Sequence, residues 1–360
     1  MKKIITLLCI SFFTLVSCSS NEDAPIVVPS ATAAHAELNG GSIDVTWPAV
    51  EGTGITYNVY RNDSPLKLNT VPLTEAKFTD VLTATGTYTY TITVNLSGLE
   101  SSKGIASEKV VLDLPKTTIV ESYTYSISNG VTTTTIHKDV NVLTYDSANI
   151  AKLNSVSTTS SDSGSMVVSK RKEVYTYSGN LITKQETVDV ADVVQSSRVY
   201  VYNDKNKMTS SVYTTSKGNV YKWVYVYNAD GTVTSTLYGI SMSGMVTPSG
   251  NTNVYTFLNG NLVKDVSTYT STNYTSTSTK VYVFDTKNNP TKYTLGFSNL
   301  FGEVANLNNV ISSVYTLSPS TTSVRNEITY NANGNILTKK VFSKEDNLPE
   351  QLSTTITYTY

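Results

Sequence analysis

The stretch that decides the fold is Val224-Tyr225-Val226-Tyr227, which is followed by the turn Asn228-Ala229-Asp230-Gly231 and by the returning segment TVTSTLY at 232–238. Valine and tyrosine alternate before the turn, so in a β-strand the valines face one way and the tyrosines the other. Asn-Ala-Asp-Gly suits a type I turn closed by a left-handed glycine, which is common hairpin chemistry. The stretch therefore predicts an antiparallel β-hairpin.

Copies of this hairpin follow one another along the second part of the chain. Each copy has an alternating strand of valine or isoleucine with aromatic residues, and this strand ends in a turn rich in Asn, Asp and Gly. The strand portions are residues 174–177, 199–202, 224–227, 254–257, 281–284 and 328–330, with a looser copy near 143–146. Serial copies predict an antiparallel meander of hairpins over residues 117–360, and whether this sheet is open or closed stays undecided.

A set of shorter strands precedes the repeats, between residues 32 and 113. Residues 42–47 and 88–94 alternate between apolar and polar side chains, and residues 56–61 form a further strand. Glycine and proline separate these strands. Short strands punctuated in this way predict a β-sandwich.

Both parts resemble known families. Trp47-Pro48 is similar to the early core tryptophan of fibronectin type III domains, residues 57–61 resemble their third strand, and Tyr88 resembles their tyrosine corner. The hairpins resemble YD (RHS-type) repeats, and more closely the repeat domains of Bacteroidota lipoproteins. These resemblances imply an all-β protein, in which an immunoglobulin-like sandwich acts as a spacer and Trp47 and Tyr88 belong to its core. A hairpin-repeat sheet would follow it.

One insertion interrupts the repeats. Apolar residues stand at 297, 300, 301, 304 and 307, which is helical spacing, and Ser298 could cap the first turn. The spacing predicts one short helix that covers an end of the sheet.

The beginning of the chain has the order of features found in an export signal. Lys2 and Lys3 precede an apolar run over 4–16 that is too short to span a bilayer. Leu15-Val16-Ser17-Cys18 resembles the lipobox of bacterial lipoproteins, which implies removal of residues 1–17 and acylation of Cys18. Residues 18–31 are expected to form a flexible tether, and its Glu22-Asp23 resembles a surface-export signal of Bacteroidota. We expect an outer-membrane lipoprotein, exposed on the cell surface and held to the membrane by the lipid on Cys18.

Composition limits the possible partners and chemistry. Removal of residues 1–17, which hold two lysines and no acid, changes the formal net charge from -1 to -3, so no basic field is left to attract nucleic acid. The only histidines are His35 and His137, and no zinc-protease, P-loop or dinucleotide motif is present. Asn331, Asn333 and Asn335 suit a turn better than a Ca²⁺ site. We therefore expect no metal, no cofactor and no enzymatic activity.

The hypothesis about ligand binding rests on the tyrosines. Equivalent tyrosines of successive hairpins, namely Tyr175, Tyr200, Tyr225, Tyr255 and Tyr282, would share one face. We favour a core role for them over an exposed stacking platform for sugar rings or a peptide, because exposing so many rings is costly. Asp146-Ser147-Ala148 resembles the O-glycosylation triplet of Bacteroidota, with Ser147 as acceptor.

The expected function is that of an envelope binding or scaffold module for a polysaccharide or a partner envelope protein. The alternative is a glycoside hydrolase that uses carboxylates, or an accessory subunit of a degradative complex. Asp189 and Asp192 form one carboxylate pair, but nothing in the sequence distinguishes them from a solvated strand edge.

Overall fold

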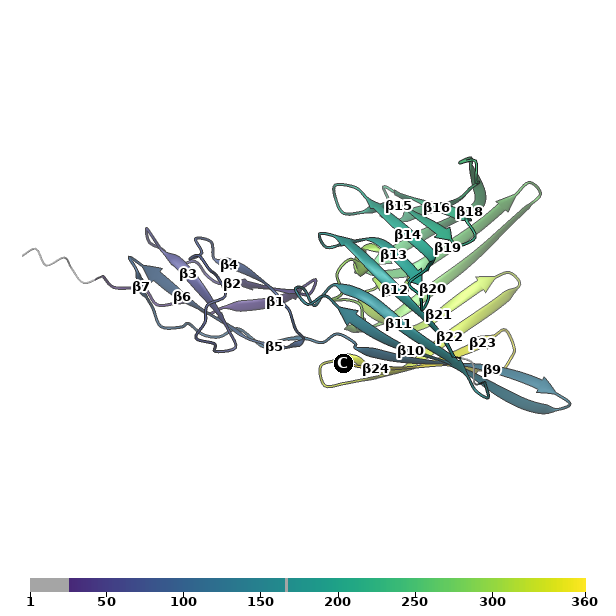
Figure 1. Cartoon of the computed structure of the whole chain (residues 1–360), viewed down its shortest axis with the longest axis horizontal. Helices are drawn as coiled ribbons and strands as arrows, with labels where there is room; N and C mark the ends of the chain where they lie inside the picture. The colour runs from purple at the N-terminus through teal and green to yellow at the C-terminus, as the bar shows by residue number, and fades with distance from the viewer. Residues whose placement is uncertain (1–25, 166–167) are drawn as a thin grey trace, which may run out of the picture.

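The computed structural model describes residues 26–165 and 168–360, and it shows two all-β bodies joined end to end (Figure 1). The smaller body is built from strands β1 to β8, and the larger body from strands β9 to β24. No helix among the described residues is long and apolar enough to cross a membrane. The predicted signal segment 1–17 and the predicted lipidation site Cys18 lie outside the described residues.

The smaller body consists of three small antiparallel sheets. The first contains β1 (His35–Asn39), β2 (Ser42–Thr46) and β4 (Lys77–Val81); the second contains β3 (Thr56–Arg61), β6 (Tyr90–Leu96) and β7 (Leu99–Glu100); the third pairs β5 (Gly86–Tyr88) with β8 (Val110–Leu112). The sheets enclose one core, to which Ile43, Val59 and Ile92 each contribute a fully buried side chain. Trp47 and Tyr88 are also buried, as predicted, and the Tyr88 hydroxyl donates to the Ala84 carbonyl at 2.6 Å.

The larger body is a closed barrel of sixteen antiparallel strands. They are β9 (Thr117–Ser128), β10 (Val131–Tyr145), β11 (Leu153–Asp162), β12 (Val168–Ser178), β13 (Leu181–Val188), β14 (Val194–Tyr202), β15 (Met208–Thr215), β16 (Val220–Tyr227), β17 (Val233–Ile240), β18 (Val246–Leu258), β19 (Asn261–Ser271), β20 (Tyr274–Asn288), β21 (Asn308–Leu317), β22 (Ser320–Tyr330), β23 (Ile336–Glu345) and β24 (Gln351–Thr359). Each strand pairs with the next one, and β24 pairs with β9 from Thr354 opposite Ser122 to Thr359 opposite Thr117.

This closure corrects the predicted fold class and the predicted family. The all-β prediction and the hairpins are correct, but the description of a fibronectin type III sandwich followed by a YD-type meander sheet is wrong. So is the assignment of the chain to lipoproteins of that architecture, because residues 117–359 form a single closed barrel. The repeat motif describes each hairpin locally. It does not encode the pairing of β9 with β24, which removes both sheet edges and joins strands more than 200 residues apart.

The predicted short helix is also wrong. Residues 289–307, here called the plug segment, connect β20 to β21 and contain only two 3-10 turns, η1 (Phe297–Asn299) and η2 (Glu303–Ala305). Gly296, with φ of 80°, stands at the first cap in place of a side-chain cap from Ser298. Phe297, Leu300 and Phe301 pack against residues of the barrel wall, so no continuous helix is needed to bury them.

The base of the barrel is the end that contacts the smaller body. The backbone N–H of Ile150 donates to the carbonyl of Leu82 at 2.9 Å, and the side chains of Asn333 and Asn335 donate to the Asp113 carboxylate at 2.7 and 3.0 Å. The Asn331 side chain closes the turn that presents these two asparagines, which confirms the turn interpretation of the three asparagines. The other end of the barrel, here called the distal end, carries loops such as 189–193 and 216–219.

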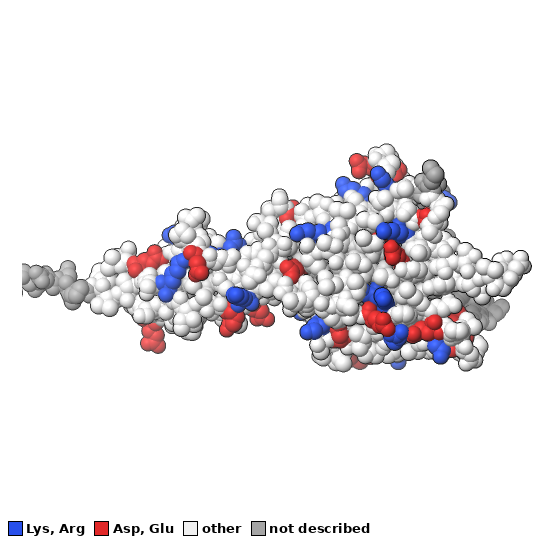
Figure 2. All heavy atoms as spheres, turned by 90° about the horizontal axis from the view of Figure 1, so that it is seen from below, with Lys and Arg blue, Asp and Glu red and all other residues white. Residues whose placement is uncertain are grey.

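Alternation gives the barrel wall two different faces. On β16, Trp223 and Tyr225 line the interior, whereas Val226 points outward and is 55 % exposed. Charged residues in the middle of other strands also point outward; they include Lys184, Glu186, Glu327 and Lys340. Figure 2 shows charged side chains at several places on the face of the molecule seen from below. A barrel that spans a membrane needs a continuous apolar band, and a lysine at its midplane costs about 2–4 kcal/mol, so this outer face suits water.

We expect the plug segment to contribute to stability through its packing on the barrel turns. A Cβ at Gly260, in the turn after β18, would meet the Leu307 side chain at 2.4 Å, whereas a Cβ at Gly130 would meet nothing within 4 Å. The two glycines have φ of 75° and 77°, so alanine at either site costs about 1–2 kcal/mol of backbone strain. In urea unfolding followed by tryptophan fluorescence, Gly260→Ala should have the lower midpoint. Equal midpoints would contradict close packing of the plug on this turn.

Candidate functional site

The interior of the barrel contains a cavity of about 560 Å³. Its wall includes Gln185, Thr187, Ser196, Arg198, Tyr200, Tyr213, Trp223, Tyr225, Tyr255, Asp265 and Tyr282, and the plug segment contributes Leu300 and Phe301. Thr187 and Ser196 flank the distal loop 189–193, whereas the plug segment begins and ends at the base. The cavity therefore lies between the plug and the distal end. Its size is within the usual range for small-molecule sites.

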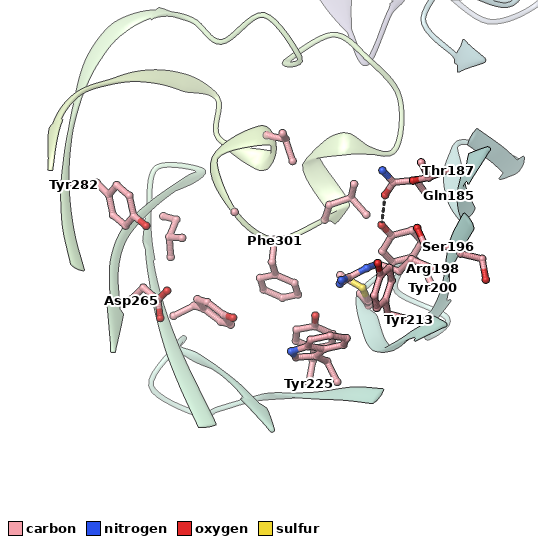
Figure 3. A pocket seen from close by; sticks show the side chains of 18 residues that line it. Gln185, Thr187, Ser196, Arg198, Tyr200, Tyr213, Tyr225, Asp265, Tyr282 and Phe301 are labelled. Carbon is pink, nitrogen blue, oxygen red and sulfur yellow. Dashed lines mark hydrogen bonds between the residues drawn. The ribbon is translucent and has the colours of Figure 1, made fainter. Parts of the chain in front are cut away.

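Phe301 stands at the centre of this site. Its ring stacks on Tyr225 with centroids 4.5 Å apart and planes at 8°, and on Tyr255 at 5.2 Å and 26°. Figure 3 shows Phe301 between a wall that carries Asp265 and Tyr282 and a wall that carries Arg198, Tyr200 and Tyr213. The plug therefore packs on some of the luminal rings, and other rings line the cavity without contacting Phe301.

Four of the five predicted stacking tyrosines line this cavity, namely Tyr200, Tyr225, Tyr255 and Tyr282. The fifth, Tyr175, packs instead on Phe297 of the plug with ring centroids 5.5 Å apart, and its hydroxyl donates to Glu173 at 2.9 Å. The alternation that grouped these residues therefore corresponds to the inner face of a barrel. A ligand-stacking role for them stays a prediction.

Burial makes the luminal tyrosines harder to ionise. It raises the pKa of Tyr200 and the pKa of Tyr282 to about 12 in each case. The Tyr200 hydroxyl donates to the side-chain carbonyl of Gln185 at 2.9 Å. At neutral pH the wall thus offers neutral hydroxyl and amide groups together with aromatic faces.

Two charged residues face the cavity from different walls. The Arg198 guanidinium lies 4.6 Å from the centroid of the Trp223 ring and 5.2 Å from that of Tyr213. Asp265 is the only carboxylate among the described residues that line the cavity, and burial raises its pKa although Lys280 opposes the shift. Its Oδ1 atom has no hydrogen-bond partner among the described residues.

A second luminal compartment, of about 320 Å³, adjoins the first. Lys280 and Lys339 approach the Glu303 carboxylate there at 3.8 and 4.0 Å, and burial lowers the pKa of Lys339. The Lys280 ammonium also lies 4.9 Å from the centroid of the Tyr282 ring, which lines the first cavity.

Sequence reasoning missed the charged luminal residues because isolated charges on polar strands resemble a solvated face. One signal could have found Arg198. It stands two and four residues before Tyr200 and Tyr202, so it has the same strand parity as the tyrosines.

The other candidates lie apart from the cavity. His35 lies near Glu108 in the smaller body at 3.4 Å, whereas His137 contacts Asp162 in the barrel at 2.6 Å. Ser147 is exposed in the loop between β10 and β11, and its glycosylation stays a prediction. Among the described residues, no group of three or more His, Cys, Asp or Glu is placed to hold a metal ion. Acylation of Cys18 falls outside the described residues and stays a prediction.

No protein-family model matches the chain, and no curated protein does so either. Among solved structures, a porin-like protein from Bacteroides uniformis matches 68 % of this chain over 96 % of its own length, with 13 % identity and a TM-score of 0.42. A porin-like protein from Bacteroides vulgatus matches 69 % of this chain over 99 % of its own length, with 14 % identity and a TM-score of 0.43. The fold described above rests on the strand pairing itself.

The raised tyrosine pKa values predict a loss of stability in alkali. The unfolded chain ionises its tyrosines near pH 10, whereas folded Tyr282 holds its proton to about 12, so the free energy of unfolding should fall as the pH rises through this window. Urea midpoints at pH 9 and pH 11 measure this fall, and Tyr282→Phe should reduce it. Tyr274→Phe, at a tyrosine that is 61 % exposed, is the control. An undiminished fall in Tyr282→Phe would contradict the burial argument.

Proposed function

We propose that this protein is a non-catalytic binding protein of the outer membrane whose barrel holds a saccharide. The observation that carries the proposal is the luminal cavity, which combines aromatic faces with neutral hydroxyl and amide groups. Sugar rings have apolar C–H faces that pack on aromatic side chains, and they have hydroxyl groups that need polar partners. The rings of Trp223 and Tyr282, which do not stack on the plug phenylalanines, and the side chains of Gln185 and Thr187 supply both kinds of contact.

The cavity argues for binding over hydrolysis. Glycoside hydrolases use a pair of carboxylates on either side of the scissile bond. Asp265 is the single carboxylate among the described lining residues, so this cavity lacks the second member of such a pair. The polar outer face of the barrel, in turn, favours a water-exposed receptacle over a membrane channel.

The proposal extends to orientation. The smaller body packs on the base of the barrel, and the described chain begins at residue 26, at the end of the smaller body far from the barrel (Figure 1). A lipid on Cys18 would hold that side at the outer membrane, so the distal end and its cavity would face away from the membrane. The smaller body would then act as a spacer.

Saccharide binding should depend on rings from both walls of the cavity. Glycan-array screening, followed by calorimetry on the best binder, should show about tenfold weaker binding for Trp223→Ala and for Tyr282→Ala, because each loses a stacking contact of about 1 kcal/mol or more. Val226→Ala, on the outer face of β16, should bind as the unaltered protein does. Absence of binding across neutral and acidic saccharides would contradict the proposal.

Protease treatment of intact cells tests the orientation. If the barrel faces outward, externally added protease should remove the signal for residues 117–360 without cell lysis. Protection of this region until the outer membrane is opened would place the barrel in the periplasm and contradict surface display, while leaving saccharide binding to its own test.

A further inference from the structure

Arg198 is a luminal cation without an acidic partner. Other inward-facing cations among the described residues contact a carboxylate: Arg171 lies 3.6 Å from Asp139, and Lys280 and Lys339 share the carboxylate of Glu303. Among the described residues, no carboxylate lies within ion-pair distance of Arg198, and its contacts are the rings of Tyr213 and Trp223. Its guanidinium projects from the β14 wall toward the interior of the cavity (Figure 3).

This arrangement leaves the hydrogen-bonding capacity of Arg198 unused. Rings contact the faces of a guanidinium, whereas its five N–H donors lie in its plane, where they match the two oxygens of a carboxylate or a sulfate. Placing an unpaired charge in a partly enclosed cavity costs free energy that an anionic ligand would recover. The two rings also hold the group in place before a ligand arrives, which lowers the ordering cost of binding.

We infer that the cavity selects an acidic saccharide, whose carboxylate or sulfate group binds the guanidinium of Arg198 while its ring packs on the free luminal aromatic side chains. This inference rests on the proposed function and adds the charge of the ligand. Asp265 on the opposite wall gives the ligand a direction, because its unpartnered Oδ1 atom can accept a hydrogen bond from a sugar hydroxyl, whereas Arg198 attracts the acidic group. The acidic group therefore lies on the β14 side, and hydroxyl groups lie on the Asp265 side.

The test compares matched saccharides with and without the anionic group. The uronate arm uses oligogalacturonates and their methyl esters, and the sulfate arm uses carboxyl-esterified chondroitin sulfate and its desulfated form, which differ in sulfate alone. Calorimetry with the full chain should show at least tenfold tighter binding of the charged member in one arm, and that arm identifies the anion. Raising the salt concentration should narrow this preference.

Variants separate the inference from the proposed function. Arg198→Gln should weaken binding of the charged saccharide at least tenfold and leave the neutral form unchanged, and Arg198→Lys should recover only part of the loss because it lacks the planar fork. Lys222→Gln, which removes a charge from the outer face of β16, is the matched control. Thermal midpoints report whether each variant is folded.

Each outcome decides between the two ideas. Equal binding of charged and neutral forms, or unchanged binding in folded Arg198→Gln, would overturn the inference. Loss of both forms in Tyr282→Ala would at the same time support saccharide binding, because Tyr282 lies on the wall opposite Arg198. If the unaltered protein bound neither form in either arm, the proposed function and the inference would fall together.

Discussion

The hydrogen-bonded pairing of β24 with β9 is the constraint on which the rest of the structure depends. It joins Thr354–Thr359 to Thr117–Ser122 and converts a chain of hairpins into a barrel without edges. A barrel of sixteen strands is too wide for its wall side chains to fill. The plug segment occupies part of this interior space at the base, where Phe297 and Phe301 pack on tyrosines of the wall. The space that remains between the plug and the distal end is the candidate binding site.

Closure also changes what the alternating pattern means. In an open sheet, a face of tyrosines is exposed to solvent unless another element packs on it. In the closed barrel the same face surrounds the interior, so Tyr225 and Tyr255 pack on Phe301 while Tyr282 lines the cavity. Some tyrosines of this row therefore pack on the plug segment, and others line the cavity. The outward valines are interspersed with lysine, glutamate and threonine, which gives the barrel a surface suited to water.

The interior chemistry follows from partial burial. Burial raises the pKa of the luminal tyrosine hydroxyl groups and the pKa of Asp265, and the tyrosines contribute neutral polar groups to much of the wall. Other luminal cations contact an acid, as Lys280 and Lys339 do when they share the carboxylate of Glu303. Arg198 departs from this pattern, because aromatic rings rather than acids surround it. The unpaired guanidinium of Arg198 is therefore the reason to test whether the ligand carries a negative charge.

The sequence by itself determined the all-β class, the hairpins with their turn chemistry at Asn331, and the grouping of the tyrosines on one face. These features depend on neighbours within a few residues, where alternation and turn propensity act. Closure, the plug and the surroundings of Arg198 were decided only by tertiary structure. Each depends on contacts between distant segments, such as β24 on β9 or Phe301 on Tyr225, and no local pattern specifies how such segments meet. The apolar spacing at 297–307 illustrates this, since Phe297 and Phe301 pack on tyrosines of the barrel wall without a helix.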